Sequence, residues 1–330
     1  MNPADPKILI KGVRKQDRRL LSKTITLIES ARPDHQQLAR KIVDEVLPHT
    51  GKAIRLGITG VPGVGKSTFI ESLGMLLVQS GHRVAVLAVD PSSSRSGGSV
   101  MADKTRMEKL AVEENAFIRP SPSGGTLGGV ARKTRETMMV CEAAGFNVII
   151  VETVGVGQSE TTVASMVDFF LVLMLAGAGD ELQGIKRGVL ELADALAINK
   201  ADGDNIEKAQ KAAKIYTTAL HMLQPASPNW DPPVLTCSAL EMTGIAEIWQ
   251  MVLKFHKQFT RCGELEHQRR KQALDWLWSM VEDELKQRFY NNPEIKQRLD
   301  QITRAVARGE TAPTLAADKL LFFLDNQRSV

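Results

Sequence analysis

Residues 60 to 68 read Gly60-Val61-Pro62-Gly63-Val64-Gly65-Lys66-Ser67-Thr68. This stretch matches G-x4-G-K-[S/T], the pattern of a loop that binds phosphate groups. The apolar run LGIT (56–59) precedes it, and residues 67–81 continue with apolar side chains at helical spacing. In such a strand–loop–helix unit, glycines let backbone N–H groups converge on phosphate oxygens, and the helix N-terminus adds its positive end. We therefore expect a nucleotide here, with Lys66 on the outer phosphates and Ser67 as a ligand of Mg²⁺.

Short β-rich apolar runs alternate with helical segments from Arg55 onward. They are LGIT (56–59), VAVLAV (84–89), VIIV (148–151), FFLVLML (169–175), ALAIN (195–199) and VLTC (234–237). Near-continuous apolar strands separated by helices are typical of a mainly parallel sheet covered by helices on both faces. The sequence thus predicts an α/β phosphate-loop fold with three parts. These are an N-terminal helical extension (1–50), a nucleotide-binding domain (51–260) and a C-terminal helical arm (261–330).

The tetrapeptide Asn199-Lys200-Ala201-Asp202 stands at the end of the run ALAIN. The carboxylate of Asp202 can accept two N–H bonds from the Watson–Crick edge of guanine, a donor pair that adenine lacks. Asn199 can reach the other side of the purine, and Lys200 can lie along the base. Further on, the run VLTC leads into Ser238-Ala239-Leu240, which can present a backbone N–H to the guanine oxygen. This combination indicates GTP rather than ATP.

Three carboxylates and one glycine are candidates for the Mg²⁺ and γ-phosphate side of the site. Glu152 follows the run VIIV and can bind Mg²⁺ or its waters, and the N–H of Gly155 can sense the γ-phosphate. Asp90 ends the run VAVLAV, and Asp103 lies beyond a Ser/Gly-rich loop. We expect both near the metal, and Asp90 also as a group that orients water. The alternatives are a helix cap or turn at Asp90 and a solvated loop charge at Asp103.

Composition excludes several classes of protein. The 330 residues are 43% hydrophobic and 24% charged, and 42 Lys and Arg against 38 Asp and Glu leave a formal net charge of +4. So small an excess does not predict binding to nucleic acid or to a membrane. Cys141, Cys237 and Cys262 are far apart in the sequence, so we expect reduced thiols in a cytoplasmic protein. The polar N-terminus does not predict a secretory signal, and no HExxH motif or His-rich tract predicts a zinc site.

Three glycine-containing loops are candidate switches, although each could simply turn the chain. They span 92–99, 121–129 and 177–188. Val156 stands where Ras-type enzymes place a glutamine directly after the glycine of the Mg²⁺ motif, and Gln158 lies further on. We therefore expect slow hydrolysis by the protein alone and stimulation by a partner.

The C-terminal helix carries apolar residues on two sides. One stripe comprises Leu274, Leu277, Trp278, Val281, Leu285 and Phe289, and a second patch comprises Ala273, Trp276 and Met280. A helix of this kind must bury both sides. Both could pack within the same domain, or one could pack against a second subunit in a two-fold homodimer.

Taken together, these motifs resemble one family. GVPGVGKST, VDPSSSRSGGS, DKTRM, ETVGVGQSE, AGAGDELQGIKRG, NKADGDN and TCSAL are similar to the MeaB/ArgK GTPases, whose human relative is the methylmalonic aciduria type A protein. The resemblance covers roughly residues 15–260, with a looser helical match beyond. It implies a GTPase that binds Mg²⁺ and GTP or GDP and has a C-terminal dimerisation arm. Its partner would be adenosylcobalamin-dependent methylmalonyl-CoA mutase, which it would protect and whose cofactor loading it would gate.

The resemblance also assigns roles to individual residues. Lys66, Asp90, Glu152 and Gly155 would be catalytic, and Ser67, Asp90, Asp103 and Glu152 would serve the metal. The stretch 177–186 would be an additional switch loop facing the mutase.

Two alternatives stay open at this point: a metal-insertion GTPase and a nucleotide-dependent small-molecule kinase. The absence of a His-rich tract and of CxxC counts against the first, and N-K-A-D counts against an ATP-dependent kinase. We expect no bound cobalamin, because the sequence contains no D-x-H-x-x-G segment.

Overall fold

A computed structural model describes residues 5–89, 107–120, 127–153, 159–177, 187–223 and 227–325. The chain divides into two compact units, Met1–Gln272 and Ala273–Val330. The finer division at residues 50 and 260 remains a prediction. Within the described part of the chain, no helix combines the length and apolar character needed to cross a membrane.

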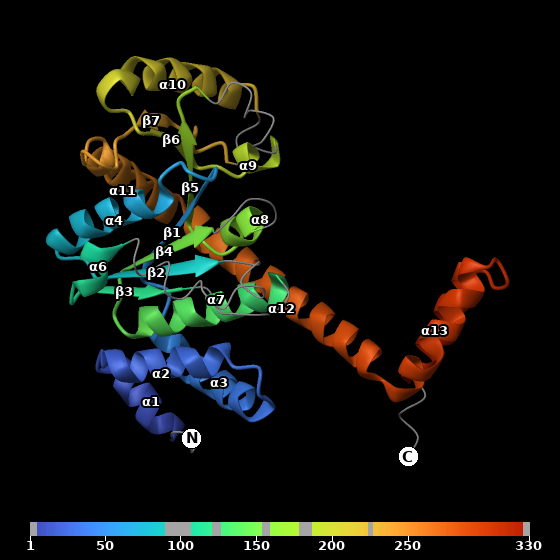
Figure 1. Cartoon of the computed structure of the whole chain (residues 1–330). Helices are drawn as coiled ribbons and strands as arrows, with labels where there is room; N and C mark the ends of the chain where they lie inside the picture. Colours follow the sequence, from blue (N-terminus) through green and yellow to red (C-terminus); the bar gives the residue numbers. More distant parts are fainter. Residues whose placement is uncertain are drawn as a thin grey trace. The chain divides into compact units, whose positions relative to one another are not determined.

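Seven parallel strands form the sheet of the first unit, in the order β3-β2-β4-β1-β5-β6-β7 (Figure 1). Their bounds are β1 Ile54–Gly60, β2 Val84–Val89, β3 Ala116–Arg119, β4 Val148–Thr153, β5 Phe169–Leu175, β6 Ala195–Asn199 and β7 Val234–Thr236. The predicted parallel sheet is therefore confirmed. Strand β3 was not predicted: it is a four-residue edge strand, AFIR, and too short to stand out as an apolar run.

Helices cover both faces of this sheet (Figure 1). In the first unit they are α1 Pro6–Arg14, α2 Arg18–Glu29, α3 Pro33–Val46, α4 Lys66–Gln79, α6 Glu108–Val112, α7 Leu127–Ala143, α8 Ser159–Ala164, α9 Arg187–Glu191, α10 Ile206–His221 and α11 Ile245–Cys262, with short 3₁₀ turns at Leu47–His49 and Gly203–Asn205. Helix α12, Glu264–Asn291, begins in this unit. The expected N-terminal helices are confirmed, and α1 to α3 pack on α7.

Two of the three N-terminal helices, α1 and α2, begin at a capping aspartate. The side chain of Asp5 accepts the N–H of Lys7 at the start of α1. The side chain of Asp17 accepts those of Arg19 and Leu20 at the start of α2. A capping carboxylate satisfies backbone donors that have no partner within the helix, and its charge complements the helix dipole.

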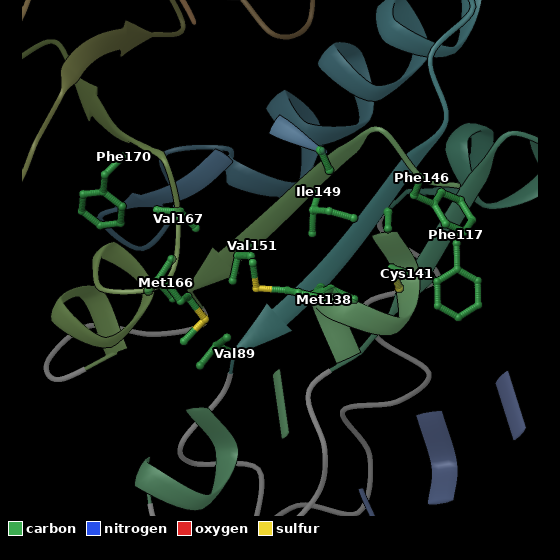
Figure 2. Close-up of a cluster of buried hydrophobic side chains, with 14 of the residues drawn as sticks. Val89, Phe117, Met138, Cys141, Phe146, Ile149, Val151, Met166, Val167 and Phe170 are labelled. Carbon is green, nitrogen blue, oxygen red and sulfur yellow. The ribbon is translucent and has the colours of Figure 1, made fainter. Parts of the chain in front are cut away.

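The strands are apolar throughout because each face of the sheet has its own core. On β4, Ile149 and Val151 belong to the core beneath α7, while Val148 and Ile150 belong to the opposite core with α4 and α11. Figure 2 shows part of the first core, where the side chain of Met138 from α7 lies over these strands. Alternate residues of a strand point to opposite faces, so a sheet buried on both sides needs apolar residues at nearly every position.

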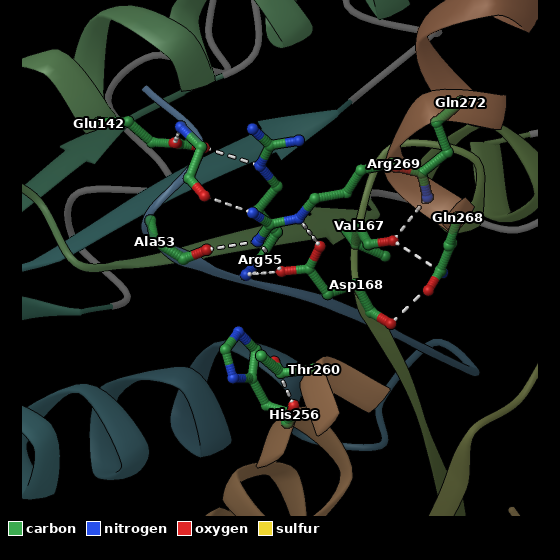
Figure 3. A network of polar contacts seen from close by, with 11 residues as sticks. Ala53, Arg55, Glu142, Val167, Asp168, His256, Thr260, Gln268, Arg269 and Gln272 are labelled. Carbon is green, nitrogen blue, oxygen red and sulfur yellow. Dashed lines mark hydrogen bonds and ion pairs between the residues drawn. The ribbon is translucent and has the colours of Figure 1, made fainter. Parts of the chain in front are cut away.

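A polar network lies at the amino-terminal edge of the sheet, where β1 and β5 begin (Figure 3). The guanidinium of Arg269, in the first turns of α12, donates Nε and Nη2 to the two carboxylate oxygens of Asp168, each at 2.7 Å. It also donates to the backbone oxygens of Gly51 and Ala53. Asp168 in turn accepts the N–H of Arg55 at 2.8 Å. Burial alone would lower the pKa of Arg269, but the bonds and charge of Asp168 outweigh it and raise this pKa.

The second unit contains the rest of α12 together with α13, Pro293–Ala307, and α14, Pro313–Asp325. The buried Asn292 caps α13 by accepting the N–H of Glu294 at 2.9 Å, and it donates to the carbonyl of Phe323 on α14 at 3.2 Å. Arg298 stacks over the ring of Phe323. On α12, five residues of the predicted apolar stripe are exposed: Leu274, Leu277, Trp278, Val281 and Leu285.

Replacing Arg269 by alanine should destabilise the first unit by about 2–4 kcal/mol, because it leaves the buried carboxylate of Asp168 without its bidentate partner. Arg270→Ala is a matched control, because its ion pair with Glu266 is solvated on both sides. This control should change the unfolding free energy by no more than about 0.5 kcal/mol. Urea unfolding followed by circular dichroism measures both. Equal effects would contradict the structural role of Arg269.

Asp194, directly before β6, should make stability depend on pH. Its carboxylate accepts the N–H of Phe170 at 2.8 Å, but burial, with a contribution from Asp168, raises its pKa to about 7. Because the folded pKa exceeds the unfolded one, this group's contribution is fully present below about pH 4 and is lost as the pH rises through 7.

Asp194→Asn, which mimics the protonated form, should therefore gain stability relative to wild type between pH 5 and pH 8. The expected gain is about 1–3 kcal/mol, the equivalent of one to two pKa units. Urea titrations at both pH values, with the exposed Asp231→Asn as control, give the measurement. A difference that does not change with pH would refute the assignment.

Candidate nucleotide-binding site

The predicted phosphate loop joins β1 to α4. Gly60 ends the strand, and a Cβ there would lie 2.5 Å from the carbonyl oxygen of Leu173 on β5, so only glycine fits. Gly65 precedes the first turn of α4 with φ +92°, in the left-handed region that favours glycine. The loop thus turns tightly between a buried strand and a helix N-terminus, the geometry that directs backbone N–H groups toward an anion.

Lys66 and Ser67 occupy the first turn of α4. The ammonium of Lys66 reaches back across the loop and donates to the carbonyl of Gly60 at 2.8 Å. The hydroxyl of Ser67 donates to the carboxylate of Glu152, at the end of β4, at 3.5 Å. Glu152 is buried, so this carboxylate is largely shielded from solvent. A hydroxyl and a carboxylate therefore meet at the carboxyl edge of β1 and β4, and the ammonium of Lys66 lies against the end of β1.

This arrangement fits a Mg²⁺ ion that is held together with a nucleotide. Hydroxyl and carboxylate oxygens are the ligand types that Mg²⁺ prefers, and the ion commonly takes one or two from protein and the rest from phosphates and water. Within the described ranges, no group of three or more His, Cys, Asp or Glu residues could hold a metal ion. Ser67 and Glu152 would accordingly be the protein ligands in this part of the chain.

Several predicted residues lie outside the described ranges. These are Asp90, Asp103, Gly155, Val156 and Gln158, together with the loop 92–99 and most of the loops 121–129 and 177–188. Their assignments to metal, water and switch roles remain predictions.

Asn199, at the end of β6, links the phosphate loop to residues 238–240, the predicted guanine loop after β7. Its side chain is 1% exposed. The amide Nδ2 donates to the carbonyl of Val64 at 2.8 Å, and Oδ1 accepts the N–H of Ala239 at 3.1 Å and the thiol of Cys237 at 3.6 Å. Burial raises the pKa of Cys237 to about 12, so the thiol keeps its proton and acts as a donor. The predicted contact of Asn199 with the purine stays a prediction, for which Nδ2 has a second proton.

Lys200 and Asp202 follow β6, and their side chains bond the phosphate loop and the loop after β7. Lys200 has φ +61°, and its ammonium donates to the carbonyl of Gly63 in the phosphate loop at 2.7 Å. The carboxylate of Asp202 accepts the hydroxyl of Ser238, which is fully buried. Ser238 therefore orients the predicted guanine acceptor, a role that its position in the sequence did not suggest.

The structure brings most of the described candidates to one edge of the sheet. Residues 60–68 follow β1, Glu152 ends β4, Asn199 to Asp202 follow β6, and Ser238 to Leu240 follow β7. Ligands of open parallel sheets bind at the carboxyl ends of the strands. One residue of this edge was not predicted from the sequence: Ser72 on α4, whose hydroxyl donates to the carbonyl of Ala239. Its only sequence signal is a serine in an apolar helix.

Comparisons with known proteins identify the family of this chain. Residues 21–294 match the family model described as methylmalonyl Co-A mutase-associated GTPase MeaB. The GTPase ArgK of Escherichia coli is 48% identical over 96% of each chain. The mitochondrial methylmalonic aciduria type A homolog of Mus musculus is 44% identical over 95% of this chain and 78% of its own. A crystal structure of a LAO/AO transport system kinase superimposes with a TM-score of 0.80 at 42% identity, covering 99% of both chains.

Asp202→Asn should reverse the base preference, because an amide presents a donor where guanine offers two N–H groups. The loss of two charge-assisted bonds should weaken GTP binding by about 3 kcal/mol or more, over a hundredfold. Xanthosine triphosphate, which carries an oxygen in place of the amino group, should bind the variant better than GTP does. Calorimetric titration measures both nucleotides, and the exposed neighbour Asp204→Asn is the control. Equal affinity of the wild type for ATP and GTP would contradict the assignment.

Proposed function

Because this chain belongs to the family of methylmalonyl Co-A mutase-associated GTPases MeaB, and is itself a GTPase, we propose that it is an accessory protein of adenosylcobalamin-dependent methylmalonyl-CoA mutase. In this role its GTP cycle protects the mutase and gates the loading of the mutase cofactor. The similarity to a protein named for methylmalonic aciduria supports the same partner. The protein acts in the cytoplasm and binds no cobalamin itself.

One observation carries the nucleotide part of this proposal: the side chain of Asn199 joins the phosphate loop at Val64 to the guanine loop at Ala239. The two ends of a GTP molecule are thereby recognised by one connected piece of protein. Lys66 holds the outer phosphates and offsets the charge that develops during hydrolysis. Ser67 and Glu152 hold Mg²⁺, which neutralises phosphate charge when bound.

The sequence favours a timer rather than a fast hydrolase, because Val156 stands where Ras-type enzymes place a glutamine. In the described part of the chain, the hydroxyl of Ser67 lies at hydrogen-bond distance from the carboxylate of Glu152, and we assign both groups to the metal. A water-orienting group is assigned to Asp90 from the sequence alone. A partner that completes such a site can raise turnover by about 10³–10⁵-fold, and the mutase is the proposed activator.

Segments that contact the mutase should begin beside the nucleotide. Strand β5 pairs with β1 so that Leu173 lies opposite Gly60 of the phosphate loop, and β5 ends two residues later. The chain that continues into residues 177–188 thus starts at the nucleotide edge. This supports a switch segment that reports the γ-phosphate to a partner.

The apolar stripe of α12 supports a homodimer built through the C-terminal arm. Trp278 is 62% exposed and Leu274 58% exposed on the same helix. Contiguous exposed apolar side chains of this size mark an interaction surface. A second copy of the chain is the proposed occupant, and the other predicted patch, with Trp276 and Met280, is only partly exposed.

A kinase or a metal-insertion GTPase would show a different dependence on added components. The crystal structure at 42% identity is that of a protein named a transport system kinase. That name describes the other protein. Kinase activity would require an acceptor molecule and would leave phosphate on it. The proposed function requires only water as the acceptor and a protein as the activator.

Purified methylmalonyl-CoA mutase should accelerate GTP hydrolysis at least tenfold, within the range known for partner-activated GTPases. Lys186→Ala, in the predicted switch segment, should keep the basal rate and lose most of the acceleration. The exposed Lys208→Ala on α10 is the matched control and should behave as wild type. Phosphate release with and without mutase gives the rates. No acceleration of the wild type would refute the proposed partner, and phosphate transferred to an added amino acid would favour the kinase.

A further inference from the structure

The loop after β7, residues 238–243, is closed by backbone hydrogen bonds between its two ends, and three side chains from other segments bond to it. Backbone bonds in both directions join Ser238 and Thr243, at 3.0 and 3.2 Å. Inside this closure, the hydroxyl of Ser238 bonds Asp202, the N–H of Ala239 donates to Asn199, and the carbonyl of Ala239 accepts the hydroxyl of Ser72 at 2.6 Å. The first two bonds come from the predicted guanine motif. The third comes from the helix that carries the phosphate loop.

Ser72 uses its hydroxyl in an unusual way for a helical serine. Serine in a helix commonly bonds back to the carbonyl four residues earlier, as Ser80 does with Leu76 at the end of α4. Ser72 is 7% exposed, and its hydroxyl instead crosses to a segment 167 residues away in sequence. Alanine would be the better helix former at this position. A serine at this position is thus explained by its hydrogen bond to the carbonyl of Ala239 and not by helix propensity.

The contact fixes the direction of a backbone donor. No peptide bond described here is cis, so the N–H of Leu240 points away from the carbonyl of Ala239 that Ser72 holds. Within the described residues, the N–H of Leu240 has no hydrogen-bond partner, and its side chain is 80% exposed at the tip of the loop. The Ala239–Leu240 peptide is therefore oriented from the protein interior, and its N–H is directed away from α4.

We infer that Ser72 is a positioning residue for guanine recognition, which orients the Ala239–Leu240 peptide so that the N–H of Leu240 meets the guanine oxygen O6. This inference rests on the proposed guanine-nucleotide site. It adds a mechanical link that the guanine motif itself lacks. In the proposed site, Lys66 and Ser67 at the start of α4 act on the phosphates and their metal. Ser72 on the same helix orients the base loop, residues 238–243. Its loss should loosen the base end while leaving the phosphate end intact.

Ser72→Ala should raise the Kd for GDP and GTP by about two- to tenfold, the value of one buried hydrogen bond. GDP should dissociate faster by a similar factor, and the hydrolysis rate at saturating GTP should not change. Ser80→Ala, which removes a hydroxyl from the same helix without touching the base loop, is the matched control. Thermal unfolding of the nucleotide-free proteins verifies that the variant is folded.

A sulfur analogue separates positioning from general loosening of the fold. In 6-thio-GTP the guanine oxygen is replaced by sulfur, a weaker hydrogen-bond acceptor, so the wild type has less to lose at that atom. Ser72→Ala should therefore reduce affinity for 6-thio-GTP clearly less than affinity for GTP. Equal losses for the two nucleotides, or no loss for either, would overturn the inference.

The same titrations distinguish this inference from the site on which it rests. If Asp202→Asn leaves base preference unchanged, the proposed guanine site itself fails. If Asp202→Asn switches preference while Ser72→Ala has no nucleotide-specific effect, the site stands and the role of Ser72 is wrong.

Discussion

The parallel direction of all seven strands is the constraint on which the site depends. Every strand delivers the segment that follows it to the same edge, so residues far apart in sequence meet without any special contact to gather them. Lys66, Glu152, Asn199 and Ser238 come from the ends of four different strands. The short polar contacts among them refine positions that the sheet has already assigned. The buried amide of Asn199 is the most connected of these contacts, with Val64 on one side and Ala239 on the other.

The opposite edge of the sheet has a different task. There Arg269, Asp168 and Arg55 form an ordered network around the starts of β1 and β5, and α12 leaves from this point. Glu142 extends it by bonding Arg55 at 2.7 Å. These groups form ion pairs that are largely buried, which is tolerable because each group has several partners. One edge thus carries the proposed nucleotide site, and the other holds the first turns of α12.

Local patterns predicted the fold well, and long-range contacts were beyond their reach. The phosphate loop and six of the strands could be predicted because a short motif or an apolar run specifies each one. Strand β3 is only four residues long, and its pairing with β2 decides it. Nothing in Arg269-Arg270-Lys271 distinguishes the buried arginine from its solvated neighbours. The link from Asn199 to Val64 spans 135 residues, so it follows from the strand order and not from either segment.

The cross-link through Asn199 has a thermodynamic consequence for ligand capture. Hydrogen bonds within the protein join residues 238–240 to the phosphate loop through Asn199, so we expect this part of the site to be ordered when the chain folds. The entropy of arranging it belongs to folding and not to association. These two loops should then contribute to the heat-capacity change on nucleotide binding only through the surface that the ligand covers, and not through coupled folding.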